Sequence, residues 1–179
     1  MKKILLISII VFGLASVFLL GAKFLKSPTK NISVSQLQAS QSPNNVFLAK
    51  DFNGEKGTEV FFDKAEIKLD AAIFADHQAR FYNVKMPDNK IIYFFVVKDK
   101  NGIYHAAANA CQVCFSARKG FHQEGDEIVC NNCGNRYPLE KIATEKGGCN
   151  PAPINPNLEV ANGRLTITQA ELAPVAGFF

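Results

Sequence analysis

The segment Cys111–Tyr137 reads CQVCFSARKGFHQEGDEIVCNNCGNRY and holds four of the five cysteines of the chain. They form two C-x-x-C pairs, Cys111 with Cys114 and Cys130 with Cys133, and 15 residues separate the pairs. Each pair can bring two thiolates to one centre, and the intervening segment is long enough to fold back. The spacing therefore predicts a metal centre with four cysteine ligands.

The fifth cysteine, Cys149, follows after another 15 residues, inside the sequence GGCNPAP. Glycine, asparagine and proline around it predict a tight loop. We expect Cys149 to line the site or to act as an alternate ligand. Gly134, Gly147 and Gly148 are candidates for letting backbone N–H groups approach the sulfur atoms.

Histidine and phenylalanine side chains near the pairs are the next candidates. His122 lies between the two pairs, where it could support the ligand loops through a hydrogen bond. His77 and His105 stand alone and are interpreted as surface or core residues. Phe115 and Phe121, at the start of the segment between the pairs, are expected to shield a metal centre from water.

Three kinds of chemistry are open to these thiols: disulfide bonds, a zinc ion or an iron–sulfur cluster. Disulfides are permitted in an exported domain, but five cysteines leave one unpaired, and C-x-x-C bridges are more often redox-active than structural. A metal is therefore favoured, either zinc in a closed tetrahedral site or a [2Fe–2S] cluster that exchanges one electron. The spacing alone does not separate zinc from iron and sulfide.

A long apolar run lies near the N-terminus. Ile4 to Ala22 are 19 residues without a charge, with lysines on both sides. A helix needs about 20 such residues to cross a bilayer, and the run exceeds the core of about 7–15 residues in a signal peptide. We expect an uncleaved single-pass anchor in the cytoplasmic membrane over residues 1–26, a flexible linker over 27–45, and an extracytoplasmic β-rich metal-binding domain over 46–179.

The charge of the chain is unevenly distributed. The net charge is +4, from 20 basic and 16 acidic residues, and five lysines lie within the first 30 residues. All the acidic residues follow residue 46, which leaves 15 basic against 16 acidic residues and a net charge of −1 for the rest. The sequence therefore does not predict a nucleic-acid partner, and it argues against a cytoplasmic zinc ribbon that binds nucleic acid.

Short apolar runs bounded by turn residues predict a mainly β domain. Residues 79–84 and 91–97 flank the turn sequence MPDN and are expected to pair as a hairpin. The second of these runs is apolar on both faces, so it should be a central strand. The other expected strands are residues 59–62, 66–69, 103–109, 127–129 and 164–168, and short helices are expected at 139–144 and 169–172.

The cysteine motifs resemble the cluster-binding part of Rieske domains. The order AC-x-x-C, GDEIVC and NNCGNRY matches two ligand loops, with Cys114 and Cys133 where Rieske domains have histidines. GGCNPAP falls where those domains have a proline loop over the cluster, and EVANGRLTI suits their closing strand–turn–strand. This resemblance implies a Rieske-like antiparallel β domain that carries a [2Fe–2S] cluster.

A closer resemblance is to the FtrD-like membrane iron–sulfur family. It is carried by RFY, FFVVKD, ACQVCF, KGF, GDEIVCNNCGNRY and GGCNPAP, over roughly residues 60–179. The resemblance implies a membrane-anchored iron–sulfur protein that transfers single electrons or supports iron transport at the outer face of the membrane, beside a membrane redox or metal-transport partner. A zinc-stabilised, four-cysteine binding module on a membrane stalk is the alternative.

The sequence has no evident nucleophile–base pair, paired acid–base carboxylates or phosphate-binding loop. We therefore expect an electron-transfer or metal-binding protein rather than a stand-alone enzyme.

Overall fold

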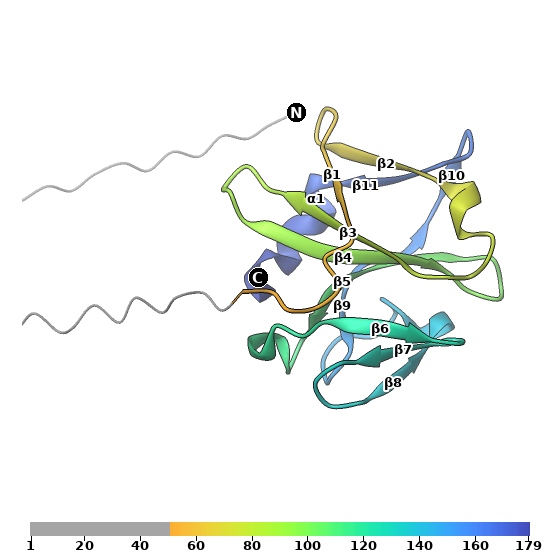
Figure 1. Cartoon of the computed structure of the whole chain (residues 1–179). Helices are drawn as coiled ribbons and strands as arrows, with labels where there is room; N and C mark the ends of the chain where they lie inside the picture. Colours follow the sequence, from red (N-terminus) through yellow and green to blue (C-terminus); the bar gives the residue numbers. More distant parts are fainter. Residues whose placement is uncertain (1–50) are drawn as a thin grey trace, which may run out of the picture. The chain divides into compact units, whose positions relative to one another are not determined.

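A computed structural model describes residues 51–179 of the chain (Figure 1). The anchor predicted over residues 1–26 and the linker predicted over 27–45 lie outside the described residues. Within residues 51–179, none of the helices has the length and apolar character needed to cross a membrane.

A five-stranded sheet forms the middle of the described part, in the order β1-β3-β4-β5-β9. Its neighbours pair antiparallel, except that β1 runs parallel to β3. As predicted, β3 and β4 form a hairpin, and β4 is the central strand. The bounds are β1 Thr58–Val60, β3 Arg80–Lys85, β4 Ile91–Lys98, β5 Tyr104–Cys111 and β9 Pro151–Leu158.

Successive side chains of β4 point to opposite faces of this sheet, and both faces are covered. Phe94 and Val96 belong to one apolar core, and Phe95 and Val97 belong to a second. All four are fully buried. The alternation explains why this strand reads as a continuous apolar run, and it gives the sheet two separate cores.

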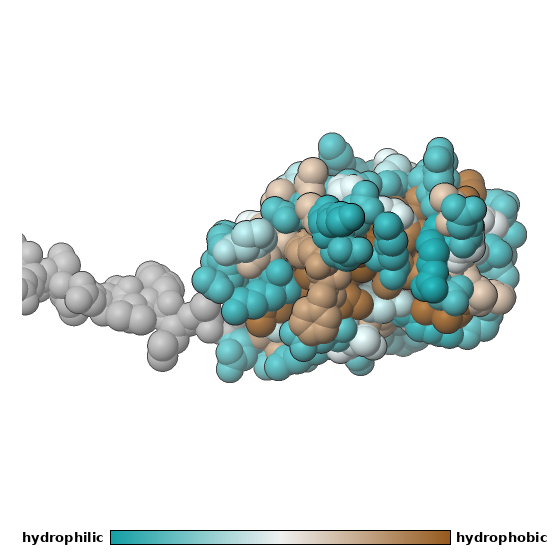
Figure 2. All heavy atoms as spheres, turned by 90° about the horizontal axis from the view of Figure 1, so that it is seen from above, coloured by the Kyte–Doolittle hydropathy of each residue, from teal (hydrophilic) through white to brown (hydrophobic). Residues whose placement is uncertain are grey.

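The first core lies under a three-stranded antiparallel sheet, β10-β11-β2, drawn above the central sheet in Figure 1. Along β2, Ile67 and Leu69 are buried while Lys68 and Asp70 are exposed. Figure 2 shows that the surface seen from this side is hydrophilic with apolar patches between the polar side chains. The bounds are β2 Glu66–Asp70, β10 Val160–Ala161 and β11 Arg164–Thr168.

The second core lies under another antiparallel sheet, β6-β7-β8, drawn below the central sheet in Figure 1. It contains Phe121 and Ile128 of this small sheet, and also the buried thiols of Cys111 and Cys130. One cysteine of each C-x-x-C pair is therefore built into a hydrophobic core. The bounds are β6 Phe121–Glu124, β7 Glu127–Cys130 and β8 Arg136–Pro138.

Helices are few and short in the described part. The helices predicted near residues 139 and 169 are present, and a capping box of Thr168 and Glu171 begins the second. The bounds are η2 Ala71–Phe74, η3 Phe115–Ala117, η4 Leu139–Lys141, α1 Gln169–Leu172 and η5 Ala173–Phe178. The domain is mainly β, as the sequence predicts.

Two strands differ from the sequence-based expectation. β1 ends at Val60, and Phe61, which was expected to continue it, is 73% exposed. β9 was not predicted, because its sequence PAPINPNL carries three prolines. Proline cannot donate a ladder hydrogen bond and is confined to edge strands and bulges. β9 meets both conditions, since it lies at the sheet edge and its register with β5 shifts three times.

Asn109 joins the central sheet to the β6-β7-β8 sheet. It is fully buried on β5, and its Oδ1 accepts a hydrogen bond of 2.7 Å from the Phe121 backbone N–H. Its Nδ2 donates to the Glu55 carbonyl oxygen at 2.7 Å. Gly120 allows this contact, because it has φ +61° and a β-carbon there would lie 2.5 Å from Asn109 Oδ1. One buried amide therefore holds the start of the small sheet in place.

We predict that Gly120→Ala destabilises the protein more than Gly125→Ala. Both glycines have left-handed backbones, at φ +61° and +58°, but a β-carbon on Gly125 meets no atom within 4 Å. The control should lose about 1–2 kcal/mol for the left-handed backbone, and Gly120→Ala should lose about 1–3 kcal/mol more for the clash. Urea unfolding of the full chain in detergent, followed by circular dichroism, measures both. Equal losses would show that Asn109 moves aside freely.

Candidate metal centre

All five cysteines are free thiols, and they converge from three parts of the fold. Cys111 ends β5 and Cys130 ends β7, and both side chains are buried, with 3% and 2% exposure. Cys114 precedes η3 and is half-buried, and Cys133 is exposed in the loop after β7. Cys149, half-buried, lies just before β9.

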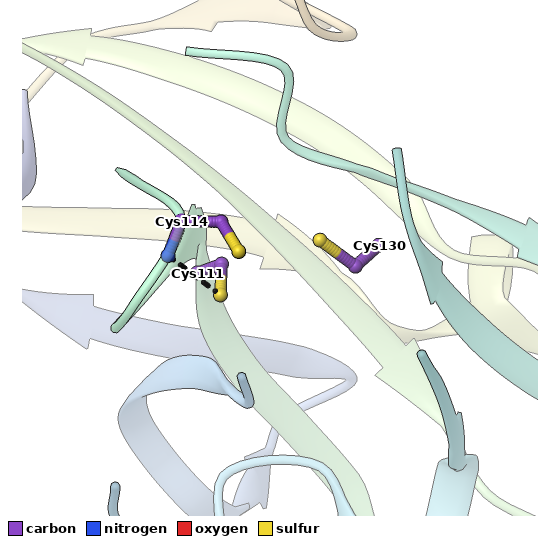
Figure 3. A group of neighbouring side chains, drawn as sticks. All are labelled: Cys111, Cys114 and Cys130. Carbon is purple, nitrogen blue, oxygen red and sulfur yellow. Dashed lines mark hydrogen bonds between the residues drawn. The ribbon is translucent and has the colours of Figure 1, made fainter. Parts of the chain in front are cut away.

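The sulfur atoms form two overlapping groups of three. The inner triad is Cys111, Cys114 and Cys130, and its Sγ atoms lie within 4.8 Å of one another. The outer triad is Cys114, Cys133 and Cys149, whose Sγ atoms meet the same limit. Figure 3 shows the inner triad, with the sulfur atoms of Cys114 and Cys130 pointing toward each other from different loops. Cys114 belongs to both triads and so lies at the middle of the site.

Backbone N–H groups approach the sulfur atom of Cys111, the buried cysteine of the first pair. Burial raises the pKa of Cys111 to about 11, and the N–H groups of Cys114 and Val113 act in the opposite direction. The Cys114 N–H donates to Cys111 Sγ at 3.1 Å (Figure 3). These donors stabilise a thiolate, but they do not offset the loss of water around a buried charge.

The second pair repeats this arrangement. Burial raises the pKa of Cys130 to about 11, against the effect of the N–H groups of Cys133 and Asn132. At the exposed end, the N–H of Asn135 lowers the pKa of Cys133. The thiol that ionises most readily therefore faces solvent, and the two that most need a cation to ionise are buried.

Asn131, between the cysteines of the second pair, ties the two ligand loops together. Its N–H donates to the Gly120 carbonyl oxygen at 3.0 Å, and its Nδ2 donates to the Lys119 carbonyl oxygen at 2.8 Å. Its Oδ1 contacts His122 Nδ1, and His122 Nε2 lies 2.8 Å from a carboxylate oxygen of Glu124. His122 therefore reaches the second pair through Asn131.

The three glycines predicted near the sulfurs all have positive φ, at +74° for Gly134, +88° for Gly147 and +68° for Gly148. The Gly134 N–H donates to the Cys130 carbonyl oxygen at 2.9 Å, which closes the loop of the second pair. The Gly147 N–H donates to the Gln112 side chain. Both N–H groups thus shape the ligand loops.

Aromatic side chains surround the inner triad. Phe121 is fully buried and contacts Tyr137 edge to face, while Phe115 is 38% exposed and packs edge to face on Phe178. A small pocket beside the inner thiols is lined by Phe52, Phe178 and other residues. The end of the chain therefore helps to cover the first ligand loop.

Tyr137 is a site residue that the sequence pattern did not single out for a role. Its hydroxyl group is buried and has no hydrogen-bond partner among the described residues. Burial raises the pKa of Tyr137 to about 12, the nearby Asn135 side chain acts in the opposite direction without meeting hydrogen-bond geometry, and the thiols of Cys149, Cys111 and Cys133 add to the rise. An O–H group held here can donate to a negatively charged sulfur atom.

The donor set fits a soft metal centre. Thiolates select zinc, copper(I) and iron–sulfur clusters over hard cations such as magnesium. The five thiols, the N–H groups directed at sulfur and the unpaired Tyr137 hydroxyl all suit a negatively charged, sulfur-rich group. Asn131 and Asn109, which position the loops, were missed in the sequence because a single asparagine has no distinctive spacing.

We predict that the pKa of His122 lies above its ordinary value near 6.5, because Glu124 accepts a hydrogen bond from the ring. The contribution of this pair to stability is present below pH 6.5 and is lost as the pH rises through the raised pKa of His122; it is also lost in acid, as the pH falls through the lowered pKa of Glu124. NMR titration should show the pKa falling in Glu124→Gln. The matched control is Glu127→Gln, which also pairs with Arg136 but does not contact His122. Equal pKa values in the wild type and Glu124→Gln would contradict this.

Comparison with known proteins places these motifs in a family. No curated protein and no solved structure matches the chain. The family model for the membrane iron-sulfur containing protein FtrD-like matches residues 74–179, which include all five cysteines and most of the described fold. Because this match covers more than half of the chain, the protein belongs to the FtrD-like family of membrane iron–sulfur containing proteins.

Proposed function

We propose that this protein carries single electrons through a [2Fe–2S] cluster held at the five-thiol site. The observation that carries the proposal is the overlap of two sulfur triads in Cys114, in a chain that belongs to an iron–sulfur family. When bound, such a cluster supplies reversible one-electron transfer.

The length of the thiol site favours two metal atoms over one. A tetrahedral zinc ion with zinc–sulfur bonds of about 2.3 Å needs four sulfur atoms about 3.8 Å apart. All five thiols lie in the described part of the chain, and no four of them come within 4.8 Å of one another. No four of the sulfur atoms therefore have the spacing of one tetrahedral ion in this structure, which supports the [2Fe–2S] cluster over the zinc-stabilised binding module.

The proposed ligands are the cysteines of the two pairs, Cys111, Cys114, Cys130 and Cys133. Cys111 and Cys130 are fixed by the ends of two strands and by the surrounding core, so they hold the buried side of the centre. Cys133 is exposed and gives a redox partner access to the other side. Phe121 and Tyr137 cover the buried side of the centre and keep water away from it.

An all-thiolate cluster is proposed to have a low reduction potential. Thiolate ligands add negative charge relative to imidazole, and this disfavours the uptake of an electron. Plant-type all-thiolate clusters lie near about −400 mV, against roughly −150 to +300 mV for Rieske centres with two histidine ligands. The protein is thus proposed to donate electrons to its partner.

The proposed setting is the outer face of the cytoplasmic membrane. The apolar run Ile4–Ala22 and the family description support membrane attachment. A membrane redox or metal-transport protein is the proposed partner, and support of iron transport is one use for the electron. The net charge of −1 outside the first 30 residues gives no support to a nucleic-acid partner.

We predict that the full chain, purified anaerobically in detergent, is brown and contains about two iron atoms and two acid-labile sulfides. Its midpoint potential should lie well below about −100 mV, because every proposed ligand is a thiolate. Metal analysis, sulfide analysis and a redox titration monitored by visible absorption measure these properties. A colourless protein with one zinc ion would overturn the proposal.

We further predict that Tyr137→Phe lowers the midpoint potential. The Tyr137 hydroxyl can donate a hydrogen bond to sulfur, which favours the more negative, reduced state. One net hydrogen bond of about 1 kcal/mol corresponds to about 40 mV for one electron. The control is Tyr82→Phe, which also removes a hydroxyl but lies in the core on the other face of the central sheet. An unchanged potential in Tyr137→Phe would mean that this hydroxyl does not contact the cluster.

A further inference from the structure

The site has one thiol more than a [2Fe–2S] cluster needs, and the extra thiol is on the exposed side. Four protein ligands complete such a cluster. The buried side offers only Cys111 and Cys130 besides the shared Cys114. The exposed side offers Cys133 and Cys149, and their sulfur atoms lie within 4.8 Å of each other and of Cys114. Cys149 therefore meets the same 4.8 Å limit from the shared sulfur as Cys133, a residue of the second pair.

The position of Cys149 is set by pairing with the first ligand loop. In the β5–β9 ladder Cys111 is the partner of Pro151, and the Gln112 N–H donates to the Asn150 carbonyl oxygen at 3.1 Å. The Gln112 side chain accepts from the Gly147 N–H, and Asn150 Nδ2 donates to the Gly147 carbonyl oxygen at 2.9 Å. The loop thus has hydrogen bonds on both sides of Cys149 that hold it against the first pair.

Cys133 is held by different contacts. The loop of the second pair is closed by the Gly134 N–H on the Cys130 carbonyl oxygen and by the Cys130 N–H on the Asn135 carbonyl oxygen, both at 2.9 Å. Cys133 and Cys149 therefore approach the centre from separate loops. Removing one of these side chains leaves the hydrogen bonds of the other loop in place.

We infer that Cys149 is a ligand at the exposed side of the centre, where Cys114, Cys133 and Cys149 supply three thiols for two coordination positions. The inference rests on the proposed function. Exchange between Cys133 and Cys149 forms one metal–sulfur bond and breaks another, and the proton of the entering thiol passes to the leaving thiolate. Charge and oxidation state are unchanged, so no oxidant or reductant is needed.

The test compares iron and sulfide content and the EPR spectrum of the reduced full chain in detergent. Cys133→Ala and Cys149→Ala should each keep most of the iron, with EPR signals shifted from those of the wild type. The double variant should lose the cluster, because Cys114 alone remains on the exposed side. Cys111→Ala, on the buried side, should lose the cluster as a single variant. Circular dichroism confirms that each variant is folded.

Thiol labelling of the loaded wild-type protein gives a second measurement that needs no variant. Iodoacetamide should modify one cysteine per chain, and peptide mass spectrometry should find the label divided among the three outer cysteines. Label confined to Cys149 would overturn the inference. So would a Cys149→Ala spectrum identical to that of the wild type, together with loss of the cluster in Cys133→Ala.

The two proposals fail in different ways. A wild-type protein with no iron and sulfide contradicts the proposed function, and the exchange of ligands then has no cluster to act on. A wild-type protein with a full cluster but with Cys149 as the only labelled thiol keeps the proposed function and removes this inference alone.

Discussion

The burial of two thiols at the ends of β5 and β7, strands of two different sheets, is the constraint on which the site depends. Cys111 and Cys130 lie in the apolar core between the central sheet and the β6-β7-β8 sheet. A thiolate there has lost most of its water, and the N–H groups aimed at each sulfur compensate only in part. A bound metal removes this cost by replacing the protons, so metal binding and ionisation of these thiols are coupled.

The fold around these thiols serves to bring distant segments to one place. The alternation of β4 divides the interior into two cores, so one face of the central sheet is free to carry the thiol site. Asn109 then fixes the first ligand loop to this sheet, and Asn131 fixes the second loop to the first. β9 adds the fifth thiol by pairing with the strand that ends in Cys111. The site therefore depends on long-range pairing more than on the cysteine spacing.

Much of this architecture could be predicted from the sequence. The period-two alternation of residues 66–69 and the apolar run 91–97 predicted their strands, because burial on one face or on both leaves a direct pattern in the chain. The convergence of the two C-x-x-C pairs was also predicted, since each pair can bring two thiolates to one centre and the segment between them is long enough to fold back. The likeness to Rieske domains and the membrane anchor remain predictions.

Other features could not be predicted, for physical reasons. β9 is rich in proline, and only its place at the sheet edge makes a strand acceptable there. Asn109 stands in an alanine-rich strand. Its role depends on two hydrogen-bond partners, the Phe121 N–H and the Glu55 carbonyl oxygen, and neither is close to Asn109 in the sequence. The approach of the Cys149 sulfur to the Cys133 sulfur likewise follows from pairing between β5 and β9. The local sequence around either cysteine does not encode this pairing.

The most direct test of a two-metal centre is X-ray absorption at the iron edge of the anaerobically purified protein. We predict an iron atom surrounded by sulfur alone, with a second shell of scattering from a neighbouring iron. This result would agree with a site in which no four thiols have the spacing of one tetrahedral ion. A metal atom with four sulfur neighbours and no metal–metal scattering would contradict the account, because it would place a single ion where we propose a [2Fe–2S] cluster.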